Sequence, residues 1–256
     1  MPCIDHAVAR LRTARTALLT KPFMARGSRV KRCSGCRVPL SHCLCALRPN
    51  VATRAGVCLL MADLEPLKPS NTGWLIADVV TDTTAFGWSR TAVDPALLAL
   101  LADPQWQAYV VFPGELVAAE RVVTVQRPEN VNAVVKANGF DTATHTQRPL
   151  FVLLDGTWPE AGKMFRKSPY LDHLPVLSLQ PEQLSTYRLR RSTHDEHLCT
   201  SEVAVLCLAL AGESRAAEAL AAYQAVFTRH YLNAKQSWPV DLEDAEHQLL
   251  RGYCQP

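Results

Sequence analysis

Residues 150–160 read Leu150-Phe151-Val152-Leu153-Leu154-Asp155-Gly156-Thr157-Trp158-Pro159-Glu160. Five apolar residues in a row, followed at once by turn-forming residues, are typical of a strand buried on both faces of a parallel sheet. An acid stands where this strand ends, and ligands bind at the carboxyl ends of strands in open α/β sheets. The stretch therefore predicts a parallel sheet with a functional site at one edge, and Asp155 is the first candidate for that site.

Three more apolar runs of the same kind lie at 57–61, 109–112 and 176–179. Helix signals lie between the runs: Thr72 is expected to cap one helix, and Asp94-Pro95 combines a cap with a proline at the first helical position. Strands that alternate with helices predict an α/β domain with a mainly parallel sheet.

The rest of the chain adds weaker signals. Apolar residues at helical spacing predict a helix over 203–210, ended by Gly212, and another over 215–232. Residues 5–19 predict a basic helix whose apolar positions are sparse. Residues 126–148 are polar and rich in threonine, which predicts a long surface loop.

The composition is that of an ordinary globular protein, with 256 residues, 48% of them hydrophobic and 20% charged. No stretch approaches the roughly 18–20 apolar residues that span a membrane, so we expect no membrane span. The net charge of +3 is unevenly distributed: residues 1–54 hold eleven Lys or Arg and one acid, while the remainder holds sixteen bases and twenty-three acids. A basic arm on an acidic body indicates a polyanionic partner such as nucleic acid, with a solvated tail as the alternative.

Four of the nine cysteines crowd into one short segment. They are Cys33, Cys36, Cys43 and Cys45. These spacings bring four thiolates within reach of one tetrahedral ion and leave no open position, so we expect a structural zinc site. Nearby cations, Arg29, Lys31, Arg32 and Arg37, would offset its negative charge. Disulfides, an iron–sulfur cluster and chance crowding are the alternatives, with His42 as a substitute ligand.

The other cysteines are scattered, and two of them, Cys58 and Cys207, lie in apolar stretches where a buried thiol behaves as a small hydrophobe. No secretory signal is visible, because residues 1–25 lack a continuous apolar region. We therefore expect a cytoplasmic protein. The arginine-rich start leaves an organellar transit peptide as an alternative.

Several loops carry residues suited to chemistry. The loop after Asp155 combines an acid, backbone amides and the plane of Trp158. It is not a phosphate-binding P-loop, because five residues rather than four separate Gly156 from Gly162 and Met164 replaces the required Ser or Thr. Residues 185–202 hold arginines suited to a phosphate or carboxylate, and end in Thr200 as an expected cap with Glu202 in the first helical turn.

The string Asp155-Gly156-Thr157-Trp158 resembles the signature of the DTW-domain family. The resemblance extends to Glu65-Pro66-Leu67-Lys68-Pro69-Ser70-Asn71-Thr72, Phe112-Pro113-Gly114-Glu115, Lys163-Met164-Phe165-Arg166-Lys167-Ser168, Ser185-Thr186-Tyr187-Arg188-Leu189-Arg190 and Cys199-Thr200-Ser201-Glu202-Val203-Ala204. With the four-cysteine cluster it covers about residues 30–232. It implies a bacterial-type tRNA-uridine aminocarboxypropyltransferase with a knotted, SPOUT-like fold. Such an enzyme transfers the 3-amino-3-carboxypropyl group of S-adenosylmethionine to N3 of a tRNA uridine, here in the variable loop, and releases methylthioadenosine.

This reaction needs a base, because uridine N3 loses a proton, whereas the sulfonium leaves as a neutral thioether and needs no acid. Asp155 is the candidate base, at a strand end where burial can raise its pKa. Trp158 is expected to stack on the uridine or the adenine, with an anchor in the core as the alternative. The predicted catalytic residues are Asp155, Thr157 and Trp158.

The remaining roles follow from the same resemblance. The residues expected at S-adenosylmethionine are Pro113, Gly114, Leu153, Leu154, Asp155, Arg190, Thr200 and Glu202. Those expected at the tRNA are Asn71, Thr72, Lys163, Arg166, Lys167, Tyr187 and Arg188. Arg188 and Arg190 are suited either to the carboxylate of the co-substrate or to a tRNA phosphate.

The expected organisation is a basic arm at 1–29, a zinc module at 30–54, a catalytic α/β domain at 55–235 and a C-terminal segment at 236–256. Two other functions stay open: a SPOUT-type RNA methyltransferase, and a noncatalytic zinc-bearing RNA-binding protein. An α/β protein of another kind with a structural zinc is the remaining alternative. The oligomeric state is not indicated by the sequence.

Overall fold

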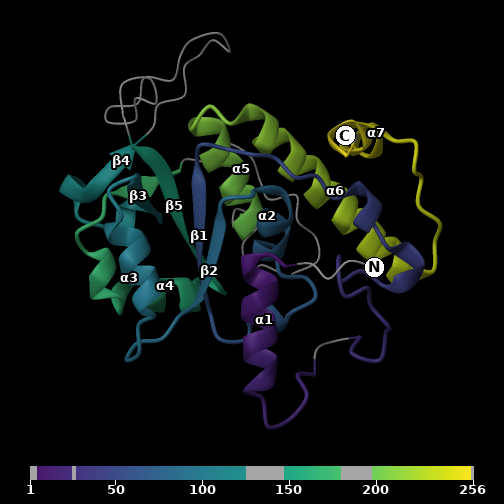
Figure 1. Ribbon diagram of the computed structural model, residues 1–256, viewed down its shortest axis with the longest axis horizontal. Helices are drawn as coiled ribbons and strands as arrows, with labels where there is room; N and C mark the ends of the chain where they lie inside the picture. Colours follow the sequence, from purple (N-terminus) through teal and green to yellow (C-terminus); the bar gives the residue numbers. More distant parts are fainter. Residues whose placement is uncertain (1–4, 25–26, 125–146, 180–197, 255–256) are drawn as a thin grey trace.

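Six strands form a parallel sheet in the computed structural model, which describes residues 5–24, 27–124, 147–179 and 198–254 (Figure 1). The strands are β1 (Gly56–Met61), β2 (Thr83–Gly87), β3 (Trp106–Val111), β4 (Val122–Thr124), β5 (Arg148–Asp155) and β6 (Val176–Ser178). Their order is β2-β1-β5-β3-β6-β4, and each neighbouring pair is parallel. The predicted α/β class and parallel sheet are therefore confirmed.

The four apolar runs of the sequence form the four inner strands, β1, β5, β3 and β6. The sequence analysis missed β2 and β4, which lie at the two edges of the sheet. An edge strand is paired on one side and partly exposed, so it needs no continuous apolar run. β2 accordingly begins with Thr83 and Thr84 and is half-buried along most of its length, and β4 has only three residues.

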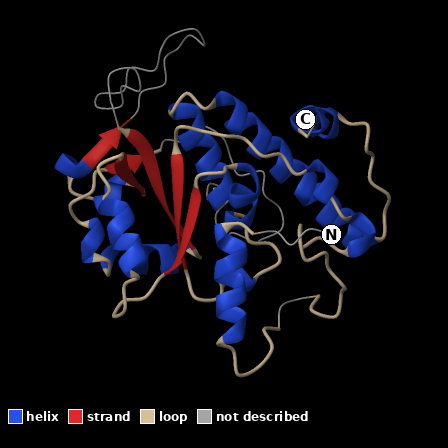
Figure 2. Ribbon diagram, in the orientation of Figure 1, coloured by secondary structure: helices blue, strands red, loops and turns tan. Residues whose placement is uncertain are grey.

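Helices cover both faces of the sheet (Figures 1 and 2). They are α1 (Ala7–Ala17), α2 (Gly73–Val79), α3 (Pro95–Ala102), α4 (Trp158–Arg166), α5 (Thr200–Leu210), α6 (Ser214–Gln236) and α7 (Ala245–Tyr253), with 3₁₀ helices at Leu40–His42, Cys45–Leu47, Glu65–Leu67, Gly114–Leu116, Ala119–Arg121 and Pro169–Leu171. Alternate side chains of β1 explain the two layers. Leu59 lies in a core with residues of α2, α5 and α6, whereas Leu60 lies in a core with residues of α3 and α4.

Most of the predicted helices are confirmed. The segments 203–210 and 215–232 fall in α5 and α6, and Gly212 follows α5 with a φ of 77° that suits glycine. Asp94 caps α3, since its Oδ1 accepts the Ala96 N–H at 2.9 Å. Of the predicted loop at 126–148, residues 125–146 lie outside the described residues, but Arg148 already belongs to β5, so the predicted end of the loop was wrong.

One of two predicted threonine caps was wrong. Thr72 occupies the capping position of α2 as predicted, but Asn71 Oδ1, rather than the Thr72 side chain, accepts a hydrogen bond there, from the Trp74 N–H at 2.9 Å. Thr200 is the first residue inside α5, so the capping position falls to Cys199. The cap of α5 thus lies one residue earlier than expected, which leaves the Thr200 hydroxyl for another contact.

The basic helix predicted near the N-terminus is α1, and it packs on the body of the protein. Val8 is fully buried in the same core as Leu59. Arg12 Nη1 donates to the carbonyls of Pro66 at 2.9 Å and Leu67 at 2.6 Å. The α1 segment is thus fixed to the turn after β1 and is not a solvated tail. Among the described residues, none of the helices is long and apolar enough to cross a membrane.

Candidate functional site

Asp155 is the last residue of β5, at the carboxyl edge of the sheet. It pairs with Met61, the last residue of β1, and two residues earlier Leu153 pairs with Val111, the last residue of β3. The loops after these three strands therefore leave the sheet side by side. Asp155 is 1% exposed, and a buried carboxylate needs hydrogen-bond donors around it.

Two side chains from distant segments supply such donors. Asn71 Nδ2 donates to Asp155 Oδ2 at 2.7 Å, and Thr200 Oγ1 donates to Asp155 Oδ1 at 2.6 Å. Asn71 belongs to the loop after β1, and Thr200 begins α5. Because each carboxylate oxygen is held from a different side, the orientation of the carboxylate is fixed relative to both segments.

Gly73 lets the start of α2 approach the carboxylate. A Cβ at this position would lie 2.7 Å from Asp155 Oδ2, which is closer than carbon and oxygen atoms pack. Any side chain at residue 73 would therefore displace Asp155. Gly73 was not among the residues predicted for the site. Its position directly after the loop that carries Asn71 could have indicated a close approach of the backbone.

A second buried carboxylate lies next to the first. Glu65 is 1% exposed, its Oε2 lies 3.3 Å from Asn71 Nδ2, and its Oε1 forms an ion pair with Lys68 Nζ. The Asn71 amide thus donates to both carboxylates, and Lys68 balances the charge of Glu65. The sequence analysis gave Glu65 and Lys68 no role, since a charged pair in a polar loop is usually at the surface.

Thr157 and Trp158 follow Asp155 into α4 and lie at the surface. Glu160 Oε2 accepts the Thr157 N–H at 2.8 Å and the Thr157 hydroxyl at 2.7 Å, and Thr157 occupies the capping position of the helix. Trp158 is 40% exposed, so the alternative of a core anchor was wrong. Both residues lie at the same edge of the sheet as Asp155.

The described residues expected at the co-substrate come from the ends of β5 and β3 and from the start of α5, whereas Arg190 lies outside the described residues. The side chains of Leu153 and Leu154 pack into the two opposite cores, and both residues pair with β1 in the sheet. Pro113 and Gly114 follow β3, where the Gly114 N–H donates to Ser178 Oγ at 3.0 Å. In α5, Glu202 Oε2 accepts the Cys199 N–H at 2.7 Å.

The four clustered cysteines meet at one point. Their sulfur atoms all lie within 4.8 Å of one another, with Cys33–Cys45 at 3.5 Å, Cys33–Cys43 at 3.6 Å and Cys36–Cys43 at 3.8 Å. Sulfurs at 2.3 Å from a tetrahedral zinc would be about 3.8 Å apart. The four residues can therefore hold one metal ion, and all four are free cysteines, which excludes the disulfide alternative.

Three thiols of this cluster have pKa values shifted in different directions. The pKa of Cys36 is lowered to about 5, chiefly by the hydrogen bond with Cys45. Burial raises the pKa of Cys43, and the pKa of Cys45 is raised chiefly by its bond to Cys36. A cation bound by these sulfurs would displace the protons that the thiols hold. His42, the proposed substitute ligand, instead contacts the Trp238 carbonyl with Nε2 at 2.8 Å.

The family model of the DTW domain matches residues 30–232, four-fifths of the chain. The chain belongs to the DTW domain family. One relative, tRNA-uridine aminocarboxypropyltransferase 2 of Drosophila melanogaster, is 41% identical over 72 residues, which make up 28% of this chain and 29% of the relative. No solved structure matches the chain. The DTW domain match includes the four cysteines and the three segments that meet at Asp155.

The DTW domain also presents a group of cations near this edge. Lys163, Arg166 and Lys167 are exposed on α4 or directly after it. The Lys163 ammonium lies 5.5 Å from the ring of Trp88. Three residues expected at the tRNA or at the co-substrate lie outside the described residues. They are Tyr187, Arg188 and Arg190.

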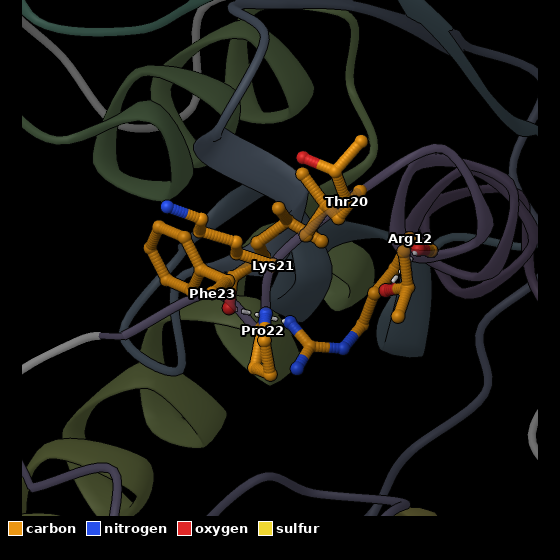
Figure 3. A pocket seen from close by; sticks show the side chains of 8 residues that line it. Arg12, Thr20, Lys21, Pro22 and Phe23 are labelled. Carbon is orange, nitrogen blue, oxygen red and sulfur yellow. Dashed lines mark hydrogen bonds between the residues drawn. The ribbon is translucent and has the colours of Figure 1, made fainter.

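Two surface hollows lie where α1 meets the DTW domain. One of about 400 Å³ is lined by Arg12, Thr16, Leu19, Thr20, Lys21, Pro22, Phe23 and Leu67 (Figure 3). The other, of about 360 Å³, is lined by Ala9, Arg12, Thr13, Arg32, Cys33, Ser34, Arg37, Pro69 and Trp74. Both include Arg12, and the described residues that line them comprise several cations without an acid. Of these cations, Arg12, Arg32 and Arg37 also donate hydrogen bonds within the protein.

Two of the scattered cysteines, Cys58 and Cys207, are buried as predicted. Cys58 and Cys207 are fully buried, and burial raises the pKa of the Cys58 thiol to about 12 and that of Cys207 higher still. A neutral buried thiol packs as a small apolar side chain.

Proposed function

We propose that this protein transfers the 3-amino-3-carboxypropyl group of S-adenosylmethionine to N3 of a tRNA uridine in the variable loop. The products are 3-(3-amino-3-carboxypropyl)uridine and methylthioadenosine. The family supports this proposal, as does the printed activity of the Drosophila relative over the shared 72 residues. The observation that carries it is the buried Asp155 carboxylate, held by two other DTW-domain segments at the carboxyl edge of the sheet.

In the proposed reaction, a bond forms between uridine N3 and the γ-carbon of the transferred group. The bond between that carbon and the sulfonium sulfur breaks, and its electron pair stays on sulfur, which leaves as a neutral thioether. The N3 proton goes to Asp155. Proton removal by a placed carboxylate contributes about 10²- to 10⁴-fold to such a rate.

Asn71 and Thr200 orient the proposed base. Their donated hydrogen bonds fix the plane of the Asp155 carboxylate, so that little reorganisation is needed when N3 approaches. Gly73 leaves the space that this arrangement needs. The same Asn71 amide nitrogen also donates to Glu65 Oε2, and Glu65 is paired with Lys68. Asn71 therefore has a positioning role in addition to the tRNA contact predicted for Asn71 and Thr72.

The remaining roles belong to the same proposal. Backbone groups of Leu153, Leu154, Pro113, Gly114 and Thr200, with Glu202 and Arg190, would hold S-adenosylmethionine. Trp158 would stack on the uridine or the adenine. Thr157 would take part in catalysis from the turn that joins Asp155 to α4. Tyr187 and Arg188 would contact the tRNA. Their positions along one edge of the sheet support these assignments for the described residues.

The tRNA is proposed to contact two cationic surfaces. One consists of Lys163, Arg166 and Lys167 near Asp155, and the other of the hollows around Arg12 between α1 and the four-cysteine segment. The domain organisation in this proposal is the one expected from the sequence. It consists of a basic arm at 1–29, a zinc module at 30–54, a catalytic domain at 55–235 and a C-terminal segment at 236–256. A structural zinc would hold the module together. A cytoplasmic location fits tRNA as the substrate.

A relation to the knotted SPOUT-like methyltransferases is also part of the proposal. It is supported by the resemblance and by the parallel sheet between two helical layers. The knot itself stays a prediction, because residues 180–197, between β6 and α5, lie outside the described part of the chain.

The test is incubation of the purified, metal-loaded protein with S-adenosylmethionine and a panel of unmodified tRNAs, followed by mass spectrometry of nucleosides and of the spent co-substrate. We expect a uridine heavier by the aminocarboxypropyl group and equimolar methylthioadenosine. Adenosylhomocysteine with a methylated nucleoside would establish the methyltransferase instead. Binding of tRNA without either product would leave the noncatalytic RNA-binding protein.

A further inference from the structure

Arg37 lies between the second and third cysteines of the cluster, yet its side chain belongs to another site. The residue is 4% exposed and has a φ of 64°, in the left-handed region that costs an L-residue free energy. Its backbone N–H donates to the Cys33 carbonyl at 2.9 Å, and the Cys33 N–H donates to the Val38 carbonyl at 2.9 Å. The backbone conformation of Arg37 is thus set by the turn that brings Cys33 and Cys36 together.

The guanidinium of Arg37 holds the loop that leads to the active site. Its Nη1 lies 3.0 Å from the carbonyls of both Pro69 and Asn71, and 3.5 Å from that of Lys68. The guanidinium carbon lies 4.4 Å from the ring centre of Trp74 and 5.4 Å from that of Phe227. Hydrogen bonds and stacking together define one position for the loop at 68–71.

Asn71 connects this loop to the carboxylate. Its carbonyl accepts from Arg37, its Oδ1 accepts the Trp74 N–H at 2.9 Å, and its Nδ2 donates to Asp155. Asn71 is fully buried, so its amide has little freedom to adopt another orientation. A continuous series of buried contacts therefore runs from Cys36 through Arg37 and Asn71 to Asp155.

We propose that Arg37 is a positioning residue through which the folded four-cysteine site holds the Asn71 loop against Asp155. Metal binding at the cysteines would then stabilise the active-site loop as well as its own segment. The consequence for activity rests on the proposed function. The position of the loop can be measured whether or not that function is correct.

The first measurement is amide hydrogen exchange over residues 67–76 in the metal-loaded full chain. Arg37→Lys keeps the charge but loses the planar fork and its stacking, and Arg37→Met removes the charge. Arg121→Lys is the matched control, because the Arg121 guanidinium likewise donates to backbone carbonyls, those of Leu171 and Leu174, and lies 5.6 Å from the ring centre of Phe165. We expect about tenfold faster exchange over 67–76 in both Arg37 variants, with metal content unchanged and the control close to wild type.

The second measurement tests the connection to the cysteines. Metal removal from the wild type should raise exchange over 67–76, whereas removal from Arg37→Met should add less than about twofold, because the connection is already lost. Equal increases in both proteins would overturn the proposal. So would wild-type exchange over 67–76 in Arg37→Lys, or an equal increase over all the helices, which would indicate general destabilisation.

Activity separates this proposal from the proposed function. Positioning predicts that Arg37→Lys lowers kcat by about tenfold or more with little change in KM for tRNA, and that methylguanidinium partly restores kcat in Arg37→Ala. A rise in KM alone would overturn the positioning role. If the loop responds as expected but the wild type forms no aminocarboxypropyl uridine, the positioning stands and the proposed function fails.

Discussion

The four-cysteine cluster draws all its sulfurs from residues 33–45, whereas the Asp155 site draws Asn71 and Thr200 from positions 84 and 45 residues away. Each of the two sites buries polar groups that water would solvate in the unfolded chain. These groups are thiols in the cysteine cluster and a carboxylate in the Asp155 site. The cluster closes a short loop at small entropic cost, and a metal ion bound there would add to its stability. The Asp155 site is assembled by the sheet and its helices, which bring the ends of β1 and β5 and the start of α5 together.

This difference indicates how each site should fail. The stability of the cysteine cluster is expected to depend on a bound metal ion and on the loss of thiol protons. Metal chelation and a change of pH should therefore alter it. The Asp155 site depends on packing and hydrogen bonds across the fold, so it should respond to single atoms in distant segments. Four predictions test the contrast.

The largest effect is expected from Asp155→Asn, which keeps the size of the side chain and removes the base. We expect the rate of product formation to fall by about 10²- to 10⁴-fold, while the metal content stays at the wild-type level. Nucleoside mass spectrometry measures the first and elemental analysis the second. Asp172→Asn, at an exposed position, is the control, and a rate for Asp155→Asn within tenfold of wild type would contradict the assignment.

Metal removal should damage the cluster next most strongly. Cys36→Ser, or dialysis of the wild type against a chelator, should abolish stoichiometric metal binding and lower the melting temperature by about 5 °C or more. Metal affinity should also fall with falling pH, since bound thiols must lose their protons. Cys254→Ser is the control, because Cys254 is exposed and outside the cluster. Unchanged metal content in Cys36→Ser would show that the four sulfurs do not form the site.

Thr200→Val tests a single atom of the Asp155 site. Valine has the shape of threonine but cannot donate to Asp155 Oδ1. We expect kcat to fall by about tenfold and the free energy of unfolding by about 0.5–1.5 kcal/mol, with Thr200→Ser close to wild type in both. Kinetics and urea unfolding measure these quantities. Wild-type kcat and stability in the valine variant would show that the hydrogen bond to Asp155 is dispensable.

The smallest effect concerns two buried histidines beside the cluster. His230 Nδ1 lies 2.9 Å from the His42 carbonyl, and its Nε2 lies 2.9 Å from His247 Nε2. Burial is the main cause that lowers the pKa of both His230 and His247 below the ordinary value of 6.5. The unfolded chain therefore takes up protons first as the pH falls, and stability present above about pH 6.5 is lost below it.

Thermal unfolding between about pH 7 and pH 5 checks this prediction. We expect a weaker pH dependence in His247→Gln, by about 2–4 °C in melting temperature over this interval. His173→Gln, at an exposed position, should follow the wild type. A His247→Gln curve parallel to the wild-type curve would show that other groups carry the acid sensitivity.

The inner strands and the cysteine site were predictable because each is written in a short stretch of sequence. Continuous apolar runs define β1, β3, β5 and β6, while the half-exposed β2 and β4 carry no such run. The cap of α5 was placed one residue too late, because threonine is the better cap on local grounds, and at α2 the hydrogen bond to the helix comes from Asn71 rather than from Thr72. Asp155 was identified from its place at the end of an apolar run, but its hydrogen-bond partners were not.

Local patterns were thus sufficient for the α/β class, the parallel sheet, the grouping of the four sulfurs and the place of Asp155 at the carboxyl edge of the sheet. Hydrophobic periodicity and ligand spacing act over a few residues, so they can be read along the chain. The burial of Glu65, the grip of Asn71 and Thr200 on Asp155, and the reach of Arg37 to the loop at 68–71 depend on segments joined by the sheet. Arg37 illustrates the distinction: in the sequence it is a cation beside cysteines, and in the folded chain it contacts the backbone that positions the carboxylate. Side-chain direction is set by packing, and packing exists only once the chain has folded.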